Sequence, residues 1–257
     1  MVGLVKMYMN ASLRPLNSLR TRLGLQPIRD FLGDWRSRVP SIDLWPEWFC
    51  PKKADWSEKS MRTGFISYDG PAATAQSIEA PGLEKYLEER PVVFAMGSGM
   101  LQDFEQQVEL FSKSCELAGQ KGLMVSGAIR GKGQLIVSEH FRVIEWAPFG
   151  ELFRRASLIV THLGIGTVAR ALASGTPMIV APLAYDQFDN GGLIKGLGAG
   201  ECMPLSRMTP RKLSALLLRV KASPGVQENC GMLQERMRFN DGLASACAVL
   251  ERGLQIR

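Results

Sequence analysis

The sequence predicts a doubly wound α/β domain with a parallel sheet, and three observations support this. From Pro91 onward, short runs rich in β-branched residues alternate with segments of helical periodicity. Each run is apolar at consecutive positions, which is typical of parallel strands buried on both faces. The composition, 46% hydrophobic and 22% charged over 257 residues, excludes a disordered, collagen-like or coiled-coil chain. We therefore expect a regular domain at residues 69–257, after an irregular segment at residues 1–68.

Five apolar runs and a weaker sixth are the expected strands, at residues 92–96, 123–126, 141–145, 158–162, 178–181 and 201–203. Between the first two runs, apolar residues recur at alternating intervals of three and four and so share one helix face: Leu101, Phe104, Val108, Phe111, Cys115 and Ala118. Further helices are expected at residues 149–155, 166–174, 191–197, 210–221 and 226–253. Strands that alternate with helices predict a parallel sheet with helices on both faces.

Residues 1–68 are expected to form a wrapping lead-in segment, because prolines and tryptophans recur in LWPEWFCP at residues 44–51. Residues 1–40 hold seven Lys or Arg against two Asp, a balance of +5 out of the net charge of +6. Such a segment is most simply a solvated basic helix face. It could also contact nucleic acid, an anionic membrane surface or an acidic partner. We predict no nucleic-acid partner and leave peripheral membrane contact open.

Several classes of protein are not expected. No apolar run approaches the roughly 18 residues that span a bilayer, and Lys6 interrupts any signal-peptide core. The five cysteines are odd in number and form no CxxC pair, which disfavours a disulfide framework or a zinc site. We therefore expect a reducing, cytoplasmic location and no metal cofactor.

Four loops that follow expected strands carry the candidate chemistry, because ligands of such sheets bind at the carboxyl ends of the strands. They are residues 97–99, 146–149, 161–167 and 182–190. The third loop, THLGIGT, leads directly into a helix. Glycines at 164 and 166 would let backbone amides approach a ligand, and the helix N-terminus attracts anions. With the Thr167 hydroxyl and the His162 imidazole beside it, this loop predicts a phosphate or diphosphate site.

Two alternatives stay open for this loop. It could be ordinary turn structure, with a histidine that is simply hydrogen-bonded. It also matches the dinucleotide fingerprint as Gly164-x-Gly166-x-x-Ala169, with Asp186 about 20 residues later as a ribose ligand. However, this match falls late in the regular region, whereas the first strand is followed by Gly97-x-Gly99-x-x-Gln102, which lacks the third glycine. An NAD site is therefore the weaker interpretation.

Together the loops resemble a known family. VIEWAPFGELF, followed by LIVTHLGIGTVARALASGTPMIVAPLAYDQFDN, resembles the donor-binding half of UDP-glycosyltransferases, above all the bacterial and sterol-glycosylating enzymes with HGGxGT and DQxxN motifs. The resemblance runs from about residue 23 to 221 and is most specific at 143–200. It implies the C-terminal, Rossmann-like domain of a GT-B glycosyltransferase, an inverting transferase that needs no metal. UDP-glucose is the expected donor, and a lipid, sterol or small-molecule hydroxyl the expected acceptor.

The resemblance also implies roles for ten residues. Ser98, His162, Gly164, Gly166 and Thr167 would bind the donor diphosphate. Trp146, Ala147 and Phe149 would border the uracil, and Asp186 and Gln187 would bind sugar hydroxyls. Three positions depart from the family pattern: Leu163, Phe149 and Arg170, the last standing where plant relatives have a ribose-binding Glu.

The family's acceptor domain, with its activating histidine, has no counterpart in this chain, so no catalytic base is predicted. Both histidines, His140 and His162, belong to the donor half. The missing domain could belong to a separate partner chain. The alternatives to a transferase half are a non-catalytic UDP-sugar-binding module, a sugar-nucleotide epimerase and an NAD-dependent enzyme.

Overall fold

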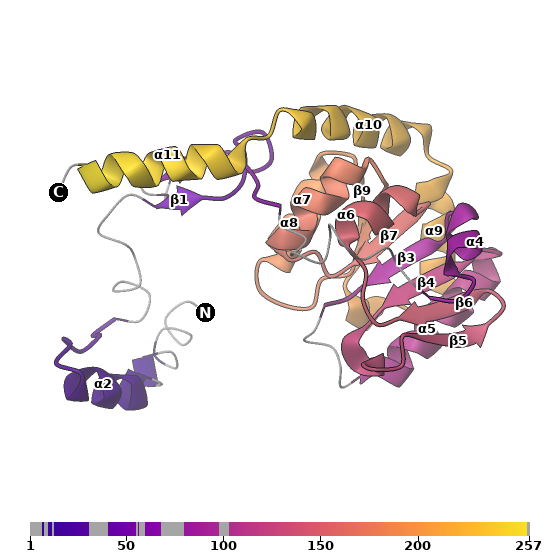
Figure 1. Ribbon diagram of the computed structural model, residues 1–257, viewed down its shortest axis with the longest axis horizontal. Helices are drawn as coiled ribbons and strands as arrows, with labels where there is room; N and C mark the ends of the chain where they lie inside the picture. Colours follow the sequence, from indigo (N-terminus) through magenta and orange to yellow (C-terminus); the bar gives the residue numbers. More distant parts are fainter. Residues whose placement is uncertain are drawn as a thin grey trace.

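The computed structural model describes residues 7, 10–11, 13–30, 41–54, 56, 60–67, 80–97 and 103–255. Its centre is a seven-stranded sheet with the order β5-β6-β4-β3-β7-β8-β9 (Figure 1). The strands are β3 (Val92–Ala95), β4 (Gly122–Val125), β5 (Gln134–Ser138), β6 (Phe141–Ile144), β7 (Leu158–Thr161), β8 (Met178–Val180) and β9 (Gly200–Cys202). All neighbouring pairs are parallel except β5 with β6. The predicted α/β class is confirmed.

Helices cover both faces of this sheet. They are α4 (Leu83–Glu88), α5 (Phe104–Ala118), α6 (Phe149–Leu152), α7 (Ile165–Ser174), α8 (Gln187–Gly196), α9 (Pro210–Lys221) and α10 (Pro224–Arg238). Val93 packs in one core cluster with α4, α6, α7 and α10, whereas Val92 and Phe94 pack in the other cluster with α5 and α9. This division follows from the strand period of two, because successive side chains point to opposite faces. Within the described residues, no helix has the length and apolarity needed to cross a membrane.

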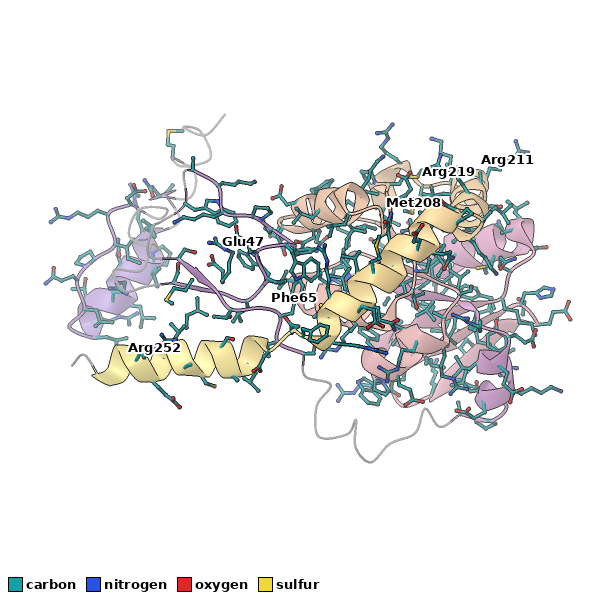
Figure 2. The ribbon with its side chains drawn as sticks, turned by 90° about the horizontal axis from the view of Figure 1, so that it is seen from above. Glu47, Phe65, Met208, Arg211, Arg219 and Arg252 are labelled. Atoms are coloured by element: carbon teal, nitrogen blue, oxygen red, sulfur yellow. The ribbon has the colours of Figure 1, made fainter. Side chains whose placement is uncertain are left out.

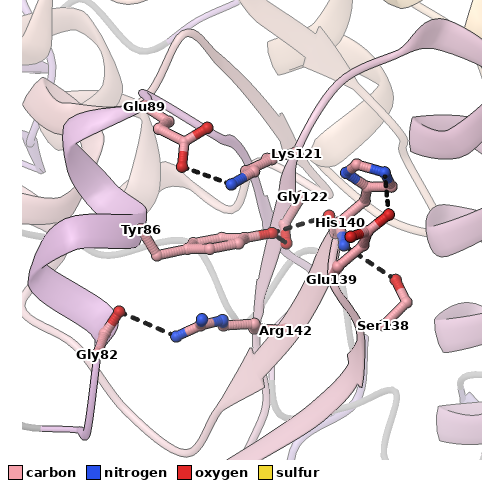
Figure 3. Close-up of polar contacts among 9 residues, drawn as sticks. All are labelled: Gly82, Tyr86, Glu89, Lys121, Gly122, Ser138, Glu139, His140 and Arg142. Carbon is pink, nitrogen blue, oxygen red and sulfur yellow. Dashed lines mark hydrogen bonds and ion pairs between the residues drawn. The ribbon is translucent and has the colours of Figure 1, made fainter.

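Helix α4 was not predicted, and a buried tyrosine fixes it to the sheet. The hydroxyl of Tyr86 lies 2.8 Å from the carbonyl oxygens of Gly122 and His140, at adjacent strands (Figure 3). The Arg142 guanidinium lies 4.4 Å from the Tyr86 ring centroid and donates to the Gly82 carbonyl at 3.0 Å. Burial raises the pKa of the Tyr86 hydroxyl, which therefore remains a hydrogen-bond donor.

The closing helix expected at residues 226–253 is instead two helices, α10 and α11 (Gly242–Gln255). Asn240 interrupts them: its side chain accepts from the Phe65 N–H and donates to the Phe65 carbonyl, both at 2.7 Å. A Cβ on Gly242 would lie 2.2 Å from that same carbonyl, so only glycine fits the start of α11. Figure 2 shows Phe65 beside this junction, and Figure 1 shows α11 extending away from the sheet.

The lead-in segment contributes to the same core as the sheet. Phe49 and Phe65 are each 2% exposed and stack edge-to-face with centroids 5.1 Å apart. They share the cluster of α4 and α7, and Trp48 packs against both rings. The other elements here are α2 (Leu13–Arg22) and the parallel pair β1 (Ile42–Asp43) and β2 (Met61–Arg62).

Candidate functional site

The candidate site lies where the direction of strand order reverses. From β3 the chain proceeds through β4 and β6 on one side, and from β7 through β8 and β9 on the other. In open parallel sheets, the loops at such a switch point diverge and leave a crevice for a ligand. Because β3 and β7 are neighbours, the sequence-predicted loops at 97–99 and 161–167 both start at this point.

His162 sits at the centre of the switch point. Its ring lies between two glycines: a Cβ on Gly97 would be 2.6 Å from His162 Cε1, and a Cβ on Gly164 would be 3.5 Å from Nε2. Gly97 has a φ of 75°, a conformation that favours glycine. His162 Nδ1 is 3.4 Å from the Ala95 carbonyl oxygen, so the end of β3 orients the imidazole. The half-buried ring is therefore held by both central strands.

Helix α7 starts directly after this histidine, and no side chain among the described residues caps its N-terminus. Gly164 is its N-cap and makes no side-chain capping bond. Ile165 and Gly166 are exposed, and a Cβ on Gly166 would meet nothing within 4 Å. The first N–H groups of a helix, here those of Ile165 and Gly166, carry the positive end of the dipole, whereas the Thr167 N–H donates to the Gly164 carbonyl at 2.8 Å. Together with the Thr167 hydroxyl on the first turn, they form a cradle suited to an anion.

Leu163 supports the cradle through a backbone conformation that leucine rarely adopts. Its φ is 59°, and its side chain is fully buried in the core. Its carbonyl accepts a hydrogen bond of 3.1 Å from the Asn190 amide, which also donates to Asp186 Oδ2 at 3.0 Å. Asn190, a position that sequence reasoning gave no role, thereby joins the third loop to the fourth. The asparagine of the DQxxN motif was the available signal.

In the fourth loop, Asp186 and Gln187 differ in their freedom to bind a ligand. Asp186 is exposed and has one carboxylate oxygen in a hydrogen bond to Asn190. Gln187 Oε1 accepts from the backbone N–H groups of Leu183, at 2.8 Å, and Ala184, at 3.2 Å. The Gln187 oxygen therefore shapes the loop, and its amide N–H groups are the part suited to a ligand.

The second loop follows β6, two strands from β3. Trp146 is 44% exposed, whereas Ala147 is buried. The Phe149 ring stacks on Phe153 with a centroid distance of 4.8 Å and an interplanar angle of 12°. Of the three residues predicted to border a base, Trp146 thus offers the most open ring surface. Ser98, the tenth predicted site residue, lies outside the described residues.

Comparisons with known proteins identify similar glycosyltransferases. A family model for the C-terminal domain of erythromycin biosynthesis protein CIII-like proteins matches residues 126–242. O-mycaminosyltylonolide 6-deoxyallosyltransferase of Streptomyces fradiae is 25% identical, over 94% of this chain and 57% of that enzyme. Sterol 3-beta-glucosyltransferase UGT80B1 of Arabidopsis thaliana is 29% identical, over 93% of this chain and 39% of that enzyme. The glycotransferase of kitacinnamycin matches in structure with a TM-score of 0.71 and 24% identity, over 94% of this chain and 61% of that one.

The fold is that of GT-B glycosyltransferase structures. The matching family model and the relatives support the C-terminal half of a UDP-glycosyltransferase, which is what the motifs predicted. It spans 57% or less of the length of the curated relatives named above.

Proposed function

We propose that the chain binds a UDP-sugar, with UDP-glucose as the expected donor, in the crevice between β3 and β7. The observation that carries this proposal is the N-terminus of α7, which no described side chain caps, beside the imidazole of His162. Backbone N–H groups, helix dipole and imidazole suit the two phosphates. The exposed Trp146 ring suits the uracil, and the carboxylate of Asp186 with the amide of Gln187 suits vicinal sugar hydroxyls.

Donor binding is proposed to need no metal, because the diphosphate charge has its partners in the cradle. Within the described part of the chain, no group of three His, Cys, Asp or Glu side chains is placed to hold a metal ion. We expect the same UDP affinity in EDTA as in magnesium. A loss of binding in EDTA would contradict this part of the proposal.

The proposed reaction is inverting transfer of the hexose to an alcohol. The acceptor oxygen forms a bond to the anomeric carbon, the bond to the diphosphate breaks, and UDP leaves with the electron pair while the hydroxyl proton goes to a base. The names of the relatives, sterol and macrolide transferases, favour an acceptor with a hydroxyl on a large apolar ring system. We propose that an acceptor domain, on this protein or on a partner chain, completes the site. Five free thiols favour a reducing, cytoplasmic location.

Calorimetric titration tests the proposal. We expect saturable binding of UDP and UDP-glucose and none of NAD, because Asp186, the candidate ribose ligand, lies six residues beyond the end of β8 at Val180, at the start of α8. Ligand at about 100 times its dissociation constant should stabilise the fold by roughly 2.7 kcal/mol. A titration with dTDP-glucose measures the base preference. Binding of NAD alone would overturn the assignment.

A further inference from the structure

The two edges of the sheet differ in how well they resist pairing with another strand. At one edge, β9 has three residues, and its central Glu201 forms ion pairs of 3.0 Å with Lys195 and 3.4 Å with Arg219. At the other edge (Figure 1), β5 holds neither a charged residue nor a proline in QLIVS at residues 134–138. Natural proteins protect exposed edge strands with short length, charges or proline, because the backbone groups of an edge can pair with another chain. β5 is therefore the edge that is suited to pairing.

β5 also exposes a row of apolar side chains. Leu135, Ile136 and Val137 are 38%, 59% and 38% exposed. Successive side chains of a strand point to opposite faces, so this row offers apolar surface on both faces of the sheet edge. Apolar surface of this kind along an edge strand favours association with another chain.

The backbone of Ile136 points out of the sheet. The Gly133 carbonyl accepts from the Glu145 N–H at 3.0 Å, which makes these two residues a hydrogen-bonded pair of the antiparallel ladder. Bonded and non-bonded pairs alternate along such a ladder. Ile136 lies opposite Arg142 at a non-bonded position, just before a bulge between Ile136 and Ser138. Its N–H and C=O groups therefore point away from β6.

We propose that β5 pairs with β5 of a second copy of this chain in antiparallel fashion, so that the two sheets join edge to edge in a dimer. A twofold axis beside Ile136 lets the two copies of this residue exchange both of their backbone hydrogen bonds. Leu135 then lies opposite Val137 of the second copy, in two equivalent apolar pairs. Such self-complementary contact is typical of twofold dimers.

The charges at the ends of β5 favour a second copy as the partner. Arg130 and Lys132 precede the strand, whereas Glu139 follows it, and all three are exposed. At the first end, the carboxylate of Glu145 accepts from a backbone N–H at 2.7 Å. At the other end, His140 lies 3.1 Å from Glu139. In the antiparallel dimer each basic end meets the acidic end of the other copy, so Lys132 lies beside Glu139 of the second copy twice.

This association goes beyond the proposed donor site and does not depend on it. β5 is three strands away from β3, whereas the crevice lies between β3 and β7. Two paired strands of five residues bury less than the roughly 1,200–2,000 Å² of a stable protein interface. We therefore expect a reversible dimer with a dissociation constant in the micromolar range.

Sedimentation velocity of the 257-residue chain over a range of concentrations tests the dimer. Ile136→Lys should raise the dissociation constant by about tenfold or more, because two like charges meet at the twofold axis. The matched control is Leu218→Lys, since Leu218 is 46% exposed on α9, a helix that packs against β8. This control should dimerise like the wild type. Ile136→Pro removes the outward N–H but no bond to β6, and it should weaken the dimer as well. Circular dichroism checks that each variant is folded.

Charge reversal at the strand ends tests the arrangement of the two copies. Lys132→Glu and Glu139→Lys should each weaken the dimer by about fivefold at low salt, because two like-charge pairs replace two attractive pairs. An equal mixture of these two variants should dimerise as well as the wild type, because each copy then meets the opposite charge at both ends.

Three results would contradict the proposal. The first is a wild type that stays monomeric at about 1 mM. The second is an Ile136 variant that associates as strongly as Leu218→Lys, which would place the interface elsewhere. The third is a mixture of the two charge variants that associates no better than either variant alone, which would exclude the antiparallel pairing of two copies.

Discussion

At the residue scale, local patterns predicted the cradle, but not the contacts that hold it. Gly164 and Thr167 could be placed because a strand end, two glycines and a helix start follow one another in the sequence. The positive φ of Leu163 and the support of its carbonyl by Asn190 could not be predicted from the sequence. The hydrogen bond from the Asn190 amide to the Leu163 carbonyl joins two loops 27 residues apart. For the same reason, the sequence suggested Gln187 as a sugar ligand without revealing that its oxygen shapes the loop.

His162→Ala should weaken UDP binding by roughly 1.5–3 kcal/mol, the scale of a hydrogen bond to a charged group. Uridine binding should change little, because uridine lacks the diphosphate. The matched control is His140→Ala, since His140 is exposed and lies at the turn between β5 and β6, away from the crevice. Calorimetry gives the affinities, and equal losses for UDP and uridine would assign His162 a purely structural role.

Asp186→Asn should separate UDP-glucose from UDP. The substitution keeps the shape and leaves an oxygen for the bond from Asn190, but it removes the charge that accepts sugar hydroxyls. We expect UDP affinity to hold and UDP-glucose affinity to fall by about tenfold, equivalent to 1.4 kcal/mol. Gln187→Ala is a poorer test, because it also removes two loop hydrogen bonds. A parallel loss for both ligands in Asp186→Asn would show that the carboxylate serves the fold.

At the element scale, the six parallel strands were predictable, five from short, mainly apolar runs that alternate with helical segments and β9 from a weaker run. The antiparallel β5 was missed, since this edge strand is exposed over most of its length and carries polar residues at both ends. The break between α10 and α11 was also missed. Its cause, the pairing of Asn240 with Phe65, joins positions 175 residues apart.

Asn240→Ala should lower the stability of the fold by about 1–3 kcal/mol, because both backbone groups of Phe65 lose their partner. For a domain of this size, that corresponds to a fall in Tm of roughly 2–10 °C in a thermal unfolding scan. Asn229→Ala on α10 is the control, since it removes a single longer bond of 3.3 Å to the Gly198 carbonyl. If the two variants unfold at the same temperature, the pairing does not tie the lead-in segment to the helices.

At the scale of the whole molecule, the chain contains the α/β domain, proposed to bind the donor, and the lead-in segment that packs against it. We expect the chain by itself to transfer sugar slowly, because a positioned base contributes about 10²–10⁴-fold and none was predicted here. The assay compares glucoside formation from UDP-glucose and a sterol alcohol with and without an added acceptor domain. Robust turnover by the chain alone would show that residues 1–65 already build an acceptor site.

The central claim is that the N-terminus of α7 and His162 bind the diphosphate of a nucleotide sugar. The most direct measurement is nuclear magnetic resonance of the isotope-labelled chain during a titration with UDP. The account predicts that the largest backbone amide shifts occur at residues 162–167, with smaller shifts at 146–149, and that uridine leaves the 162–167 amides nearly unchanged. Shifts concentrated elsewhere, or equal shifts with uridine at residues 162–167, would contradict it.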